Sequence, residues 1–190
     1  DKNAADDLAS YLEPDTTGVA TNYSNISINS TLGEVSWGTL KPQIYKEGIP
    51  VIKDINETTA SISIDYQFTS QNENEITEVY DVEEFYRMRY MDSRIRLLDF
   101  QRSASQIFDP KTAVFSEDGV ILGVRNKDVE YLSNDSGTVV AFTQQGDLWS
   151  YAPGSSKVNR VFSFRKLEDG DFRDSRNQHN IKIVRVSDEG

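Results

Sequence analysis

The stretch TASISIDYQF, from Thr59 to Phe68, alternates strictly between polar and apolar residues. Successive side chains of a β-strand point to opposite faces, so this pattern gives one apolar face and one polar face. A strand with one buried face and one wet face is typical of an antiparallel sheet. The sequence therefore predicts a mostly β (α+β) protein built on an antiparallel sheet.

The segment that follows, Ile76–Ser103, predicts a long β-hairpin with a two-residue turn at Asp92-Ser93. The expected cross-strand pairs are Met91 with Arg94, Tyr90 with Ile95, Arg89 with Arg96, Met88 with Leu97, and Arg87 with Leu98. A helix over residues 78–91 is the alternative. The β-branched and aromatic content, together with the match between the two arms, favours the hairpin.

One N-terminal helix is expected over Asn3–Leu12, because Asn3 can cap it and its alanines and leucines form one apolar stripe. A helix of about three turns needs another element to pack against. Short strands are expected over Glu34–Leu40 and Ile49–Ile55. With the strand and the hairpin, these elements predict an α+β domain at residues 1–112.

Three apolar runs between residues 138 and 164 are separated by turn-like clusters at Gln144–Asp147 and Pro153–Ser156. They predict three successive antiparallel strands, a β-meander that resembles a β-propeller blade. The residues expected to share one face are Val140, Phe142, Trp149 and Tyr151. A last strand is expected over Ile181–Val186. We place this second domain at residues 113–190 and expect a fragment of a larger array, which self-associates through any apolar face left uncovered.

The formal net charge of −11 argues against nucleic-acid binding, which depends on neutralising phosphates. The chain has no cysteine, which excludes disulfides, thiolate metal sites and cysteine nucleophiles. A run of about 18 apolar residues is lacking, so contact with a membrane would need a segment absent from this sequence. The sequence starts at Asp1 rather than at a methionine, and we expect that an N-terminal segment has been removed.

Four arginines gather in the predicted hairpin. They are Arg87, Arg89, Arg94 and Arg96. Like charges placed opposite one another destabilise a sheet, so acidic groups are expected nearby. The candidates for internal compensation are Asp65, Asp81 and Glu83. We favour this interpretation, because surface charge is usually compensated. The other interpretation is a site for an anion or carboxylate ligand, since guanidinium groups pair well with carboxylates and phosphates.

The loop EDGDFRD gathers carboxylates, the hard oxygen ligands that calcium prefers. Asp169, Asp171 and Asp174 are weak metal candidates, because Gly170 interrupts the spacing of an EF-hand loop. A solvated acidic turn is the default interpretation. His179 is the single histidine and lies in a polar segment, which predicts an exposed or turn-capping side chain. No cofactor is expected.

Four stretches together resemble a family of uncharacterised bacterial cell-surface proteins: TASISIDYQF, YDVEEFYRMRY, IRLLDFQRSASQIFD and GTVVAFTQQGDLWSY. The resemblance covers residues 55–190. It implies a membrane-anchored parent protein with an N-terminal membrane segment, a small α+β region and a propeller-like array. It also implies an extracytoplasmic location. The shared stretches are structural, so the resemblance assigns no active-site residue.

These observations predict a non-enzymatic part of a cell-surface binding or scaffold protein, with a protein or carbohydrate ligand. An aromatic set could line a carbohydrate groove, although we expect these residues to be core. The set is Trp37, Tyr80, Phe85, Tyr86, Tyr90 and Phe100. The alternative function is a carboxylate-dependent surface hydrolase of the glycosidase kind, because a catalytic carboxylate pair can come from residues far apart in sequence.

Overall fold

The computed structural model describes residues 23–117, 119–124, 129–164 and 179–188. These residues form two compact units. The first ends at Gln106 and takes in Val124, and the second contains the other described residues from Ile107 onward. The division between the two units, after Gln106, falls a few residues before the domain boundary expected after residue 112. The helix expected over Asn3–Leu12 lies outside the described residues.

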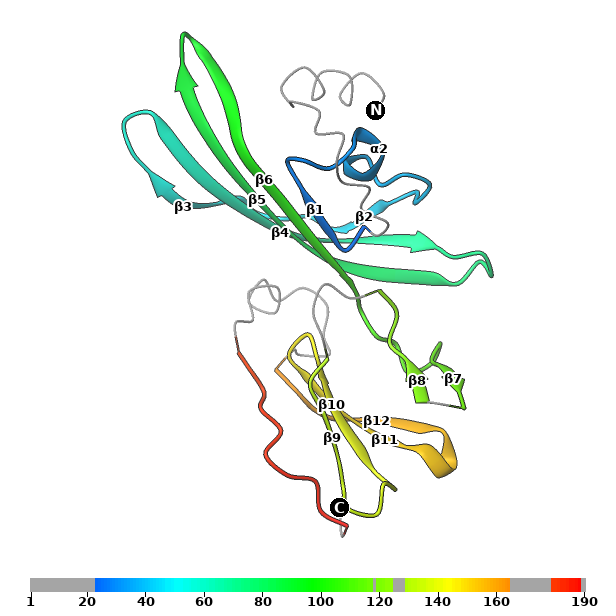
Figure 1. The fold of residues 1–190 in the computed structure, drawn as a ribbon. Coiled ribbons are helices and arrows are strands. Elements are labelled where there is room, and N and C mark those ends of the chain that lie inside the picture. The colour runs from blue at the N-terminus through cyan, green and yellow to red at the C-terminus, as the bar shows by residue number, and fades with distance from the viewer. Residues whose placement is uncertain (1–22, 118, 125–128, 165–178, 189–190) are drawn as a thin grey trace. The chain divides into compact units, whose positions relative to one another are not determined.

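An antiparallel sheet of six strands forms the first unit (Figure 1). Its strands are β1 (Asn25–Ser27), β2 (Gln43–Lys46), β3 (Val51–Ile55), β4 (Thr59–Gln71), β5 (Thr77–Met91) and β6 (Arg94–Gln106). The order across the sheet is β1-β6-β5-β4-β2, and β3 also pairs with β4. The strand expected over Thr59–Phe68 is confirmed, and it continues to Gln71. The mostly β, antiparallel fold is therefore confirmed.

Strands β5 and β6 form the predicted hairpin, so the helical alternative for residues 78–91 is wrong. At the turn, Asp92 and Ser93 have φ angles of 53° and 59°. Both central residues of a type I′ turn need this left-handed conformation, which matches the twist of the two strands. The turn sets the expected register, and all pairs from the turn back to Met88 with Leu97 are confirmed.

The register changes after Leu97, where a β-bulge adds one residue to β6. The expected pairing of Arg87 with Leu98 is therefore wrong, and Asp99 lies opposite Arg87. A bulge shifts the alternation of every residue beyond it, because two residues on one strand then oppose a single residue on the other. Phe100 and Arg102 consequently point to the covered face of the sheet, with Tyr86 and Glu84 as their cross-strand neighbours.

The short helix α2 (Leu32–Val35) lies over this covered face. Thr31 and Glu34 form a capping box, in which the Thr31 N–H donates to the Glu34 carboxylate at 2.7 Å and the Glu34 N–H donates to the Thr31 hydroxyl at 3.4 Å. This box starts a helical turn, and for that reason the strand expected over Glu34–Leu40 is wrong. Trp37 follows the helix and packs edge-on against Phe68, with ring centroids 4.6 Å apart. The buried centre of the unit consists of Phe68, Tyr80, Val82 and Ala104.

The second unit contains a four-stranded antiparallel sheet in the order β12-β11-β10-β9. Its strands are β9 (Tyr131–Ser133), β10 (Val140–Gln144), β11 (Asp147–Ala152) and β12 (Lys157–Ser163). A 3-10 turn, η1 (Pro153–Ser155), joins β11 to β12, and a small hairpin of β7 (Val114–Ser116) and β8 (Gly119–Ile121) precedes the sheet. The expected meander and both of its turns are confirmed. The described residues form no closed propeller.

An aromatic cluster fills one face of this second sheet. Phe142 lies opposite Trp149, and Val140 lies opposite Tyr151, which confirms their expected shared face. Phe108 meets the Trp149 ring edge-on at a centroid distance of 5.2 Å. Trp149 is only 4% exposed, so this cluster is the core of the second unit.

The strand expected over Ile181–Val186 is wrong, because this segment belongs to none of the sheets of the described chain. Alternating side chains are not sufficient for a strand, since its backbone groups also need a hydrogen-bonded neighbour. Asp188, just beyond the segment, instead accepts hydrogen bonds from the Ser136 hydroxyl at 2.7 Å and from the Ser136 N–H at 3.3 Å.

Among the described residues, no helix is long and apolar enough to cross a membrane.

Candidate functional site

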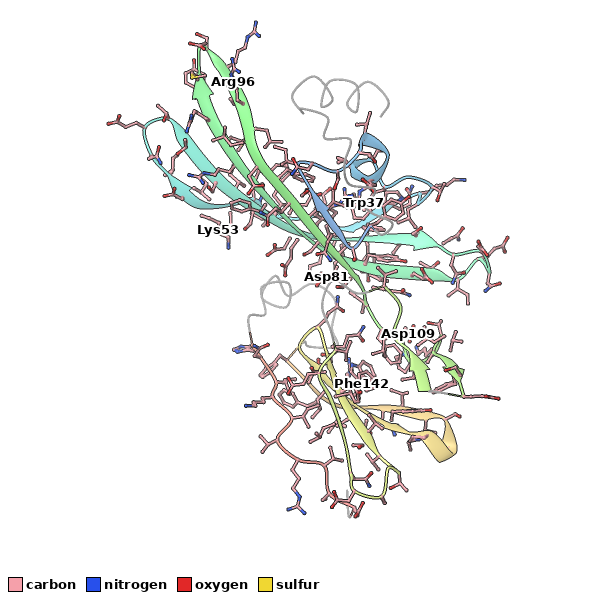
Figure 2. All side chains as sticks on the ribbon, in the orientation of Figure 1. Trp37, Lys53, Asp81, Arg96, Asp109 and Phe142 are labelled. Atoms are coloured by element: carbon pink, nitrogen blue, oxygen red, sulfur yellow. The ribbon has the colours of Figure 1, made fainter. Side chains whose placement is uncertain are left out.

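The arginines singled out in the sequence lie together on one side of the β5–β6 hairpin. We call this group the arginine face. It consists of Arg87, Arg89, Arg94 and Arg96. Arg89 and Arg96 are directly opposite each other, and all four side chains are exposed. Figure 2 shows Arg96 near the turn of the hairpin, at a distance from Trp37 and the covered part of the sheet.

The other side of the same hairpin end is apolar, and its side chains stabilise the hairpin that carries the arginines. Met88 lies opposite Leu97, and Tyr90 lies opposite Ile95. Such apolar cross-strand pairs stabilise a hairpin, and with the type I′ turn they offset the repulsion between Arg89 and Arg96. The hairpin end thus carries positive charge on one face and apolar surface on the other.

The carboxylates expected to compensate the arginines have other neighbours. Asp65 lies opposite Glu83, and Asp81 accepts a hydrogen bond from the Gln67 side chain at 3.2 Å. Asp99 lies across the hairpin, directly opposite Arg87, and it accepts a hydrogen bond from Gln101 at 3.0 Å. Within the described part of the chain, none of the four arginines forms an ion pair. Their guanidinium groups remain available to a ligand.

A fifth arginine of the hairpin, Arg102, is buried and serves the core. Its guanidinium donates to the carbonyls of Val35 at 2.7 Å and Glu34 at 2.8 Å, at the end of α2. It also lies 3.6 Å from the centroid of the Trp37 ring. Burial lowers the pKa of Arg102, and nearby Tyr66 and Glu84 oppose that shift. Sequence reasoning missed this residue. The signal was its place in an alternating series with the apolar residues Phe100 and Ala104, which put Arg102 on their face of the strand.

Glu84, the cross-strand neighbour of Arg102, is bonded to two tyrosines. It accepts hydrogen bonds from the hydroxyl of Tyr66 at 3.0 Å and from that of Tyr86. Burial first, and then the negative charge of Glu84, raises the pKa of Tyr66 well above its ordinary value. For Tyr86 the causes are burial and then the hydrogen bond to Glu84. Both tyrosines are therefore neutral donors, and within this polar cluster Arg102 is the residue that bonds to α2.

The candidate metal residues Asp169, Asp171 and Asp174 lie outside the described residues. Elsewhere in the described chain, no group of three or more His, Asp or Glu side chains could hold a metal ion. His179 is exposed, and its ring stacks on Phe164 with centroids 4.5 Å apart. This placement is that of a packed surface histidine.

Comparison of the chain with known protein families, curated proteins and solved structures finds no match. The chemistry of the site must therefore be inferred from its own residues. Four exposed guanidinium groups on one face offer planar, charged donors that match carboxylate and phosphate oxygens. They have no nucleophile or general base role, because guanidinium groups stay protonated at all physiological pH values. The arrangement can bind and orient an anion.

Proposed function

We propose that this chain is a non-enzymatic binding part of an extracytoplasmic bacterial surface protein, and that the arginine face holds a ligand bearing carboxylates or phosphates. One observation carries the proposal. Four exposed arginines stand together on one face of a hairpin, in a chain whose net charge is −11. A chain with so much negative charge repels an anionic ligand overall, so binding of one needs a local cluster of positive charge such as this.

The position of the arginine face supports a binding role. Strands β5 and β6 run from the buried centre of the first unit to the turn at Asp92-Ser93, where side chains on both faces are exposed. Tyr90 and Ile95 on the apolar side are 60% and 58% exposed. Exposed charged and apolar groups at one place are typical of a surface that meets a partner.

The second unit supports a scaffold role within the same proposal. Its sheet is a four-stranded antiparallel meander, which is the usual size of a propeller blade. We propose that this sheet is one blade of a larger array that presents the first unit at the cell surface. The arrangement is the one implied by the resemblance of residues 55–190 to a membrane-anchored surface family.

The experiment is a calorimetric titration of the protein with sodium polyglutamate and with polyphosphate, at low and at moderate salt. In the test variant, Arg89→Gln is combined with Arg96→Gln. The matched control combines Lys157→Gln with Arg160→Gln, which removes the same charge from exposed positions of β12. We expect the test variant to bind about tenfold more weakly, equivalent to about 1.4 kcal/mol.

The control should bind as the unmodified protein does. An equal loss in both variants would mean that only overall charge matters, and the arginine face would then not be the site. Tight binding that does not respond to salt would also contradict the proposal, because contacts between exposed charges are screened by ions.

A further inference from the structure

Among the described residues, the outer edge of β6 is open next to the arginine face. β1 pairs with β6 only from Gln101 to Ser103, and Ser24 accepts one further bond from the Ala104 N–H. In the described part of the chain, no strand lies beside the stretch from Arg94 to Phe100 on this side. An open strand edge presents unpaired N–H and C=O groups that can accept another strand.

The hairpin turn determines which backbone groups point to this edge. In a two-residue turn, the flanking residues Met91 and Arg94 exchange both of their hydrogen bonds. Backbone groups then alternate along β6, so those of Arg96 also point to β5. Those of Ile95 and Leu97 point outward to the open edge.

Side chains along the same edge are sorted by face. Arg94 and Arg96 are on the arginine face, and Ile95 and Leu97 are on the apolar face. A strand added at the edge would place its own side chains directly opposite these. Opposite charges and apolar pairs in such positions stabilise a sheet, whereas like charges destabilise it.

We propose that the open edge of β6 binds an extended peptide segment in which acidic and apolar residues alternate. The proposal rests on the proposed function and names the partner class of the same arginine face. The acidic side chains of the added strand lie opposite Arg94 and Arg96, and its apolar side chains lie beside Ile95 and Leu97. The backbone of the added strand bonds to the outward groups of β6, which is the β-augmentation mode of peptide recognition.

The same arginines exclude a second copy of this edge. Pairing β6 with β6 of another molecule would bring Arg94 and Arg96 against arginines, and the repulsion would oppose association. An edge strand with outward charges resists self-pairing for this reason, yet it accepts a strand of opposite charge. Charge complementarity therefore selects an acidic segment from another protein over a second copy of this chain.

The test uses a fluorescent eight-residue peptide of alternating Glu and Val, with anisotropy as the measurement. We expect this peptide to bind and a peptide of alternating Lys and Val not to bind. In the variant that combines Arg94→Glu with Arg96→Glu, the preference should reverse in favour of the Lys peptide. Failure of this reversal would overturn the assignment of the acidic residues to the arginine face.

Two N-methylated forms of the Glu-Val peptide separate strand addition from attraction of charge alone. One form is methylated at every Val and the other at every Glu, so each removes the N–H groups on one edge of the peptide. In strand addition only one form loses binding. If the added strand is antiparallel, the N–H groups of its Val residues face β6, and the Val-methylated form loses binding. If it is parallel, the N–H groups of its Glu residues face β6, and the Glu-methylated form loses binding.

Equal binding by both methylated peptides would overturn strand addition. If polyglutamate still bound through Arg89 and Arg96, the proposed function would survive that result. If polyglutamate binding were also insensitive to these arginines, both proposals would fail.

Discussion

Removal of the buried guanidinium by Arg102→Leu should destabilise the first unit by about 3 kcal/mol. The leucine leaves the carbonyls of Glu34 and Val35 without their donors, and an unsatisfied buried acceptor costs about 1–3 kcal/mol. The contact with the Trp37 ring contributes about a further 1–2 kcal/mol. The variant no longer has to desolvate a charged group when it folds, and this gain offsets part of the loss.

The assay is urea unfolding followed by the fluorescence of Trp37. The chain has 2 tryptophans, and Trp149→Phe leaves Trp37 as a specific reporter of the first unit. With an m-value of about 1.5 kcal/mol/M, the expected loss lowers the midpoint by about 2 M urea. Arg96→Leu is the matched control, since it makes the same change in the same strand at an exposed position, where substitutions usually stay within about 0.5 kcal/mol. Equal midpoints for the two variants would refute the assignment of Arg102 to the core.

Three further changes test other parts of the fold. Asp92→Asn with Ser93→Gly should stabilise the hairpin by about 0.5 kcal/mol in thermal melts, because both positions have positive φ. Alkaline titration should show late ionisation of Tyr66 and Tyr86; the unfolded chain loses these protons first, so stability falls as the pH rises above about 10. Trp149→Ala should destabilise the second unit by about 3–5 kcal/mol in urea, because this ring fills its core.

Local patterns determined the parts of the fold that the sequence could predict. Alternation at Thr59–Phe68 is a property of a single strand, and the turn at Asp92-Ser93 sets the register of a hairpin by its length alone. The meander around Trp149 combines both signals. Each of these predictions depends on residues close in sequence.

The parts that could not be predicted depend on contacts between distant residues. Ile181–Val186 alternates as a strand does, but whether it pairs depends on a neighbouring edge that its own sequence does not encode. The helix α2 had a usable signal, because Thr31 and Glu34 have the spacing of a capping box. The stretch from Glu34 to Leu40 was nevertheless expected to be a strand, and β-propensity there was outweighed by capping.

The bulge at Leu98 separates the arginine face from the core. Strict alternation from the turn would place Arg102 on the same side as Arg94 and Arg96, away from the covered face and α2. One extra residue moves Arg102 to the covered side, where the α2 carbonyls and Trp37 hold it. β6 is thus divided at Leu98 into an exposed, basic end and a buried end. The same residue type is exposed at one end of the strand and buried at the other, and a shift of one residue decides which environment each arginine has.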